Sequence, residues 1–222
     1  MSREQDWNDQ ERYRLRVQLQ WQIVGEVRLA RKDHQSIFDA CRKDIERECP
    51  ESERNSFTQW MADELDRAEA QHAAEKLNWP EVTDCDRLDR AEDALRRRGI
   101  LLWQVSPCCD SCTVAELPGR LNVINGRHPG FRDRLRGYAF FIDQNMPQEL
   151  WEGTELSIYL GYGWCEPENS KVAEKTYKKN ALGIASEIFD CLRNEGLKVD
   201  WNGSFDQKIG LSMNWQRREL LN

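Results

Sequence analysis

Apolar residues recur every three or four positions through the first hundred residues, a spacing that predicts amphipathic helices. Four helices are expected between about residues 9 and 98. Asp33 predicts the start of the second helix, because aspartate commonly caps helix N-termini. Pro50 predicts its end, because the residue before a proline is disfavoured in the helical conformation. Gly99 predicts the end of the fourth helix, since glycine often follows the last helical residue.

From residue 99 onward the hydrophobic period shortens to two, which predicts strands separated by helices. The Asn202-Gly203 pair predicts a two-residue hairpin turn between the last two strands. The order β-α-β-β-α-β-β predicts an α+β fold with a mostly antiparallel, ferredoxin-like sheet and its helices on one face. The expected domains are a helical region over residues 1–98 and an α+β domain over residues 99–222. Strands are predicted at residues 100–105, 137–143, 155–160, 197–201 and 209–213, and helices at about 111–119 and 170–195.

The charge balance narrows the classes of partner that the chain is expected to bind. Its 39 acidic and 32 basic side chains give a formal net charge of −7. No stripe of basic and aromatic residues is present, so binding to nucleic acid is not expected. No long uncharged apolar stretch and no apolar signal segment are seen, so no membrane span is expected and a cytoplasmic location is predicted. In that compartment the eight cysteines are expected to be reduced.

Three cysteines lie within five residues, directly after the first predicted strand: Cys108, Cys109 and Cys112. Thiols this close together bind metal, carry out redox chemistry or shape a turn while partly buried. A tetrahedral zinc site needs a fourth ligand, for which Cys165 and His128 are the candidates. Redox chemistry would use Cys109 and Cys112, and a helix N-terminus at this position would favour it by lowering a thiol pKa.

Three further residues are candidates for a binding site. Asp143 ends a predicted strand, from which its carboxylate is able to face a cleft. Trp215 and Arg217 follow the last strand. They either present a ring and a guanidinium to a ligand, or the tryptophan fills the edge of the core beside exposed arginines. No phosphate-binding loop or dinucleotide fingerprint is present, and the sequence alone leaves open whether the chain is an enzyme.

Several short motifs occur in a defined order over about residues 78–218. Together they resemble an uncharacterised domain-of-unknown-function family of bacteria and plants. The resemblance implies kinship of fold, and it carries over no activity. In the pattern of that family a histidine often follows the Tyr-x-Phe-Phe strand, where this chain has Ile142. The motifs are Trp-Pro-Glu-Val-Thr-Asp-Cys-Asp from Trp79, Cys-Cys-x-x-Cys from Cys108, Gly-Tyr-Ala-Phe-Phe from Gly137, Leu-Gly-Tyr-Gly from Leu160 and Trp-Asn-Gly from Trp201.

Two functions of different classes agree with these features. The first is a protein-interaction module of the inhibitor or immunity type, because a negative surface speeds association with a basic protein partner. The second is a metal- or thiol-dependent enzyme centred on Cys108, Cys109 and Cys112. The first function needs no cofactor, whereas the second would use zinc if the thiols bind metal. The sequence does not indicate an oligomeric state.

Overall fold

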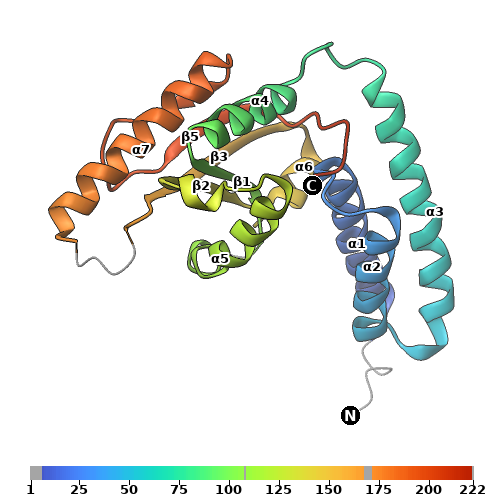
Figure 1. The fold of residues 1–222 in the computed structure, drawn as a ribbon. Coiled ribbons are helices and arrows are strands. Elements are labelled where there is room, and N and C mark those ends of the chain that lie inside the picture. The colour runs from blue at the N-terminus through green and yellow to red at the C-terminus, as the bar shows by residue number, and fades with distance from the viewer. Residues whose placement is uncertain (1–6, 108, 168–171, 222) are drawn as a thin grey trace. The chain divides into compact units, whose positions relative to one another are not determined.

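The protein is described from a computed structural model, which covers residues 7–107, 109–167 and 172–221 (Figure 1). The chain forms two compact units. The helical unit comprises Met1–Thr83, Asn145–Thr154 and Trp215–Asn222, and the sheet unit comprises Asp84–Gln144 and Glu155–Asn214. Helix α4 (Asp84–Arg97), which ends just before residue 98, belongs to the sheet unit because it contacts β1 (Ile100–Ser106) and α7 (Glu174–Asn194). The predicted division of the chain into two domains at residue 98 stays a prediction.

The helical unit contains α1 (Asp9–Leu29), α2 (His34–Glu48), α3 (Glu51–Lys76) and the short α6 (Met146–Glu152). Local capping explains where the first two helices begin. The side chain of Asn8 accepts hydrogen bonds from the backbone at the start of α1, and Asp33 caps α2 as predicted. Apolar side chains of α1, α2 and α3 then form one core, which includes Leu15, Leu19, Ile23, Ile37, Cys41, Ile45, Phe57, Met61 and Leu65.

The C-terminal segment belongs to this helical unit and is held by backbone hydrogen bonds. The Trp215 amide donates to the carbonyl oxygen of Thr154 at 2.6 Å, and the Leu221 amide donates to that of Ala30 at 2.7 Å. Helix α6, which the sequence pattern did not predict, packs against α1. The helical unit therefore combines three segments that are far apart in the sequence.

The sheet unit contains five strands in the order β1-β2-β3-β5-β4. β1 and β2 are parallel neighbours, while the other pairs are antiparallel. The structure confirms the α+β class with an N-terminal helical region, and the sheet is mixed. In a ferredoxin-like sheet another strand separates the two parallel strands of the β-α-β unit, so this order differs from the predicted one. The strands are β1 (Ile100–Ser106), β2 (Gly137–Ile142), β3 (Glu155–Trp164), β4 (Lys198–Asp200) and β5 (Ile209–Asn214).

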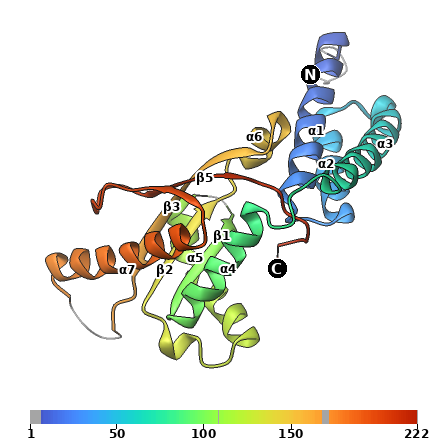
Figure 2. The same cartoon turned by 90° about the horizontal axis from the view of Figure 1, so that it is seen from above.

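Helices cover both faces of the sheet, which corrects the prediction that they lie on one face (Figures 1 and 2). On one face, Leu101 and Trp103 pack with residues of α5 (Asp110–Arg127). On the other face, α4 (Asp84–Arg97) contacts both β1 and α7 (Glu174–Asn194). The sequence carries a signal for this arrangement, because β1 is buried at every position, as strands covered on both faces are.

The connection between β4 and β5 is longer than predicted. β4 ends at Asp200 and β5 begins at Ile209, so residues 201–208 form a loop instead of a two-residue hairpin. Gly203 has a φ of 78°, and the side chain of Asn202 accepts a hydrogen bond from the Ser204 amide. The Asn-Gly pair therefore makes a local turn inside the loop, while the antiparallel pairing of the two strands is as predicted.

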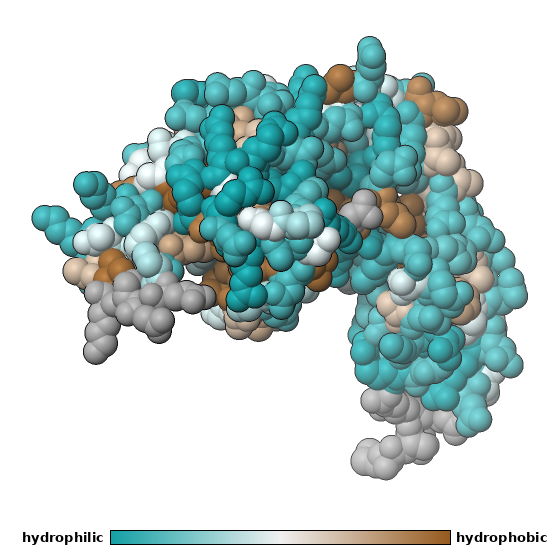
Figure 3. All heavy atoms as spheres, viewed as in Figure 1, coloured by the Kyte–Doolittle hydropathy of each residue, from teal (hydrophilic) through white to brown (hydrophobic). Residues whose placement is uncertain are grey.

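The surface is polar on the face shown in Figure 3, where hydrophilic side chains predominate. Among the residues that the structure describes, no helix has the length and apolar character needed to cross a membrane. This agrees with the sequence, in which charged residues make up 32% of the chain.

Candidate functional site

Two of the three clustered thiols lie where β1 passes into α5. Cys109 is the N-cap residue of α5, and its carbonyl oxygen accepts a hydrogen bond from the Thr113 amide at 2.9 Å. Cys112 follows in the first turn of the same helix. The side chain of Cys109 is exposed and that of Cys112 is partly buried. Cys108 lies outside the described residues. The structure thus places one accessible thiol and one shielded thiol at the start of a helix.

A buried pair of hydroxyl groups fixes the start of α5 against the end of β1. Ser106 Oγ and Thr113 Oγ1 are 3.0 Å apart, and both residues are fully buried. The Ser106 hydroxyl also donates to the carbonyl oxygen of Phe141 in β2 at 3.1 Å. Because Thr113 Oγ1 carries a single proton, it donates either to Ser106 Oγ or to the carbonyl oxygen of Pro107, which lies 3.3 Å away. These bonds hold the first turn of α5 in one position relative to the strand end.

The strand leading into this site is irregular at Val105, which has a φ of 51°. A β-branched residue rarely adopts the left-handed region, because its side chain crowds the backbone there. The pairing of β1 with β2 shifts register between Trp103 and Ser106. Residues in such strained conformations persist only where the surrounding structure holds them in place, and they cluster at functional sites. The irregularity therefore marks the end of β1 as a candidate site.

Asp143 lies at the same end of the parallel strands β1 and β2 as the thiols. Its backbone amide donates to the carbonyl oxygen of Ser106 at 2.9 Å. Because β1 and β2 are parallel, their C-terminal ends meet, and this end is where sheets with helices on both faces commonly bind ligands. Lys208 also reaches this region, with its Nζ 2.5 Å from the Asp110 carboxylate. The structure thus brings Asp143, Cys109 and Cys112 to one end of the parallel strand pair.

The two residues predicted as a fourth zinc ligand lie elsewhere in the sheet unit. His128 follows the C-terminal end of α5, whose 18 residues span roughly 27 Å. The amide of Cys165 donates to the backbone carbonyl oxygen of Arg136 at 2.9 Å. Arg136 directly precedes β2, so Cys165 lies at the opposite end of this strand from the thiols. No group of three potential ligand atoms in the described part of the chain includes Cys109 or Cys112. A zinc site that uses Cys108 stays a prediction.

Trp215 and Arg217 are both buried in the helical unit. Trp215 is 1% exposed, and its Nε1 donates to the carbonyl oxygen of Leu29 at 3.3 Å. Arg217 is 5% exposed, and its guanidinium carbon lies 5.2 Å from the centre of the Trp215 ring. The tryptophan thus fills the core, in line with one of its two interpretations. The arginine is stacked on it instead of being exposed. Their role in binding stays a prediction.

A groove of about 960 Å³ lies at the end of the sheet unit opposite the thiols. Cys165 lines it, and burial raises the pKa of this thiol to about 11. The Arg136 guanidinium and the Glu187 carboxylate, which also line the groove, form two hydrogen bonds of 3.0 and 2.8 Å with each other. Because its thiol is protonated at neutral pH, this groove offers no thiolate nucleophile.

A cluster of potential metal ligands in the helical unit was not predicted from the sequence. One ring nitrogen of His34 and one carboxylate oxygen each from Asp66 and Glu69 lie within 4.8 Å of one another. The spacing of three between Asp66, Glu69 and His72 is a detectable signal, because such residues share one helix face. The approach of His34 was not detectable, since it depends on how α2 packs against α3.

Comparisons with known proteins give one match. No curated protein and no solved structure is found to be similar to this chain. A family described as a domain of unknown function matches residues 10–219. The match covers nearly all of both compact units, including every strand of the sheet and the C-terminal segment. The chain therefore belongs to the DUF6891 family, a domain of unknown function.

Proposed function

We propose that the protein carries out thiol–disulfide exchange through Cys109 and Cys112. The observation that carries this proposal is their placement at the N-cap and in the first turn of α5, directly after a parallel strand. A Cys-x-x-Cys pair at a helix start within a β-α-β unit is typical of redox proteins. Residues three apart on a helix have Cβ atoms about 5–6 Å apart, whereas a disulfide needs about 3.5–4.5 Å, so closing the bond requires a small backbone movement at the helix start as well as rotation of the side chains.

Because Cys109 is exposed and Cys112 is partly buried, we propose that Cys109 attacks the partner first and Cys112 acts second. The Cys109 thiolate attacks one sulfur of a partner's disulfide, forming a mixed disulfide and releasing the partner's other sulfur as a thiolate. The Cys112 thiolate then attacks the Cys109 sulfur and releases the partner's second sulfur. The partner disulfide gains two electrons and, on protonation, two protons. The two protein thiols lose the same number and become joined by an S–S bond.

The helix N-terminus at Cys109 favours its thiolate, and an ion pair nearby offsets an opposing charge. The N-terminus of α5 presents the positive end of the helix dipole to the sulfur, which stabilises a negative charge. Asp110 is the nearest residue along the chain with a carboxylate, which would disfavour a thiolate. Lys208 forms an ion pair with this carboxylate at 2.5 Å and offsets its charge. The pair is partly exposed, so its contribution is modest.

A trapping experiment tests this proposal. The reduced protein is mixed with a peptide that contains one disulfide, and the products are identified by mass spectrometry. Wild type is expected to reduce the peptide. The Cys112→Ser variant is expected to accumulate a mixed disulfide at Cys109, because no second thiol resolves it. Cys109→Ser should form none, and Cys165→Ser, which removes a thiol at the opposite end of β2, should behave as wild type. Equal, slow reduction by all four proteins would contradict the proposal.

A second candidate function rests on the charge of the chain. With a formal net charge of −7, the protein is suited to binding a basic protein as an inhibitor or immunity-type partner. This proposal predicts that a partner from the native lysate is retained at low ionic strength and released as salt rises, because exposed charges are screened. Retention of no partner under either condition would remove this candidate and leave thiol exchange unaffected.

A further inference from the structure

A histidine and two carboxylates from α2 and α3 converge in the helical unit. His34 is the first residue of α2, and its Nδ1 lies 3.1 Å from Glu69 Oε2. Asp66 lies one turn before Glu69 on α3, and its carboxylate belongs to the same group of ligand atoms. Ligand atoms around a tetrahedral zinc ion with bonds of about 2.1 Å are about 3.4 Å apart. The separation of 3.1 Å between His34 and Glu69, which is also a hydrogen-bond distance, is close to that value, and all three ligand atoms lie within 4.8 Å of one another.

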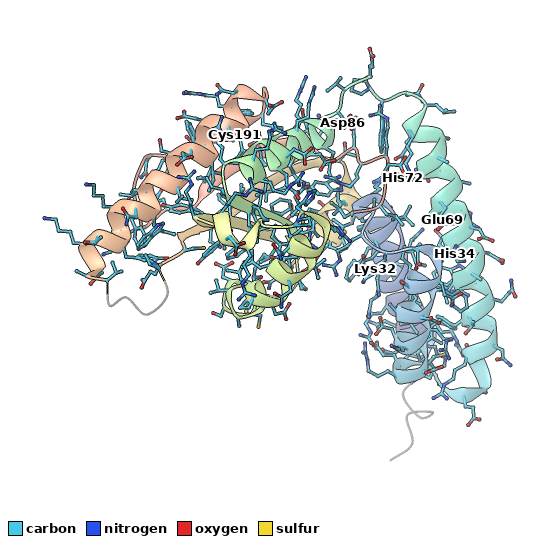
Figure 4. All side chains as sticks on the ribbon, viewed as in Figure 1. Lys32, His34, Glu69, His72, Asp86 and Cys191 are labelled. Carbon is cyan, nitrogen blue, oxygen red and sulfur yellow. The ribbon has the colours of Figure 1, made fainter. Side chains whose placement is uncertain are left out.

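The second observation is His72, one turn after Glu69 on α3 (Figure 4). His72 is buried, with an exposed fraction of only 7%. It lines the same pocket of about 340 Å³ as His34 and Glu69. Within the described residues, neither ring nitrogen of His72 has a hydrogen-bond partner; a carboxylate oxygen of Glu75 lies 3.9 Å from its Nδ1, beyond hydrogen-bond distance. Buried polar groups almost always have one, so an unsatisfied ring at a pocket indicates a bound molecule or ion.

The charges around the pocket are compatible with a cation. The three cationic side chains that line it are already engaged. Lys32 forms an ion pair of 2.6 Å with Glu26, Lys76 donates to the Arg218 carbonyl oxygen at 2.8 Å, and the Arg218 guanidinium donates to the Pro80 carbonyl oxygen at 2.5 Å. The carboxylates of Asp66 and Glu69 supply two negative charges beside the His34 ring, which favours a cation at this position.

We infer that His34, Asp66 and Glu69 bind a divalent transition-metal ion, with Zn²⁺ as the preferred ion. A mixed nitrogen and oxygen ligand set suits zinc, and three protein ligands leave a fourth position for water. His72 hydrogen-bonds to the molecule in that fourth position, which satisfies its otherwise unpaired ring. This site is separate from the thiols of the sheet unit, and it does not depend on the proposed thiol exchange.

The test uses Zn²⁺ alone, titrated by calorimetry into metal-free full-length protein. All proteins carry Cys108→Ser, Cys109→Ser and Cys112→Ser, so that the clustered thiols contribute nothing. About one zinc ion per chain is expected to bind. His34→Gln and Glu69→Gln should each weaken binding by at least about tenfold. His72→Phe should retain the stoichiometry with a smaller loss of affinity. Circular dichroism before titration verifies that each variant is folded.

Asp63→Asn is the matched control, because Asp63 lies on the same helix, one turn before Asp66, and outside the ligand group. It should bind zinc as the parent does. The inference is overturned if the thiol-free parent binds no zinc, or if His34→Gln and Glu69→Gln bind it as tightly as Asp63→Asn.

Discussion

Gly25 of α1 lies against the backbone of Pro147 in α6, so closely that a Cβ atom at position 25 would overlap the Pro147 carbonyl group. Gly25→Ala is therefore expected to lower the free energy of unfolding by about 2–3 kcal/mol, because the backbone of α6 must shift. Chemical denaturation measures the change. In the control Gly183→Ala, the new Cβ meets no atom within 4 Å, so the variant should be unchanged or up to about 1 kcal/mol more stable. Equal midpoints for the two variants would show that α6 does not pack on α1 in this way.

Trp215 is expected to be a major stabilising residue of the helical unit. Its ring is buried, and its indole nitrogen is bonded to the Leu29 carbonyl oxygen at 3.3 Å. Trp215→Ala should lower the free energy of unfolding by about 3–5 kcal/mol, as other large-to-small core substitutions do. Trp151→Ala removes a tryptophan that is 39% exposed and should cost much less. If the melting temperature of the Trp215 variant falls no more than that of the Trp151 variant, the Trp215 ring is not part of the core.

His72 is expected to make the protein sensitive to acid. The pKa of His72 is lowered to about 4, mainly by burial and also by the positive charges of Lys76 and Arg28, while Glu75 acts in the opposite direction. The pKa in the unfolded chain is about 6.5, so the unfolded state binds the proton first as pH falls. The stability is therefore complete above about pH 7, and it falls as pH drops from 6.5 towards 4, by up to about 3 kcal/mol.

His72→Phe should remove this part of the pH dependence, because phenylalanine retains a flat aromatic ring in the core but has no group that titrates. Unfolding curves at several pH values between 7 and 4 provide the measurement. The control His128→Gln removes an exposed imidazole and should keep the acid sensitivity of wild type. If the His72→Phe and wild-type stabilities fall in parallel over this range, the buried histidine is not the group responsible.

The cysteines should differ widely in their reaction with iodoacetamide. Cys109 is exposed, whereas Cys41 is completely buried and its burial raises the pKa of that thiol to about 12. Because the thiolate is the reactive form, Cys109 should be alkylated at least about tenfold faster than Cys41 in the native protein. Pulse alkylation followed by peptide mass spectrometry gives the rates. Comparable rates for the two cysteines would mean that the helical core opens on the timescale of the pulse.

Much of the fold was predictable because its signals are local. Asp33 caps α2, and Gly99, with a φ of 76°, follows α4 where the pattern predicted the end of that helix. The order of the strands was not predictable, since β3 pairs with β5 across the intervening helix α7. Helix α6 also escaped detection, because its seven residues are too few to show a helical period. Its stability comes from packing on α1, which is a tertiary effect.

In the candidate sites, too, the features with a local sequence signal were predictable and those that depend on tertiary packing were not. The placement of Cys109 and Cys112 at a helix start after a strand followed from the sequence, and the structure adds their different exposure. The contact between Asp143 and Ser106 depends on the parallel register of β1 and β2. The approach of His34 to Glu69 depends on the packing of two helices. Neither contact has a local signal, so neither was predictable from the sequence.

Thiol–disulfide exchange requires that Cys109 and Cys112 form a reversible disulfide, which equilibration of the protein with glutathione redox buffers tests directly. After alkylation, cleavage before Asp110 separates the two cysteines, so a disulfide between them links two peptides. A Cys108→Ser background removes the adjacent thiol. The linked peptides should appear with a single two-electron transition as the buffer becomes more oxidising. Cys109 and Cys112 that stay reduced across the whole range, or that form only glutathione adducts, would contradict thiol–disulfide exchange.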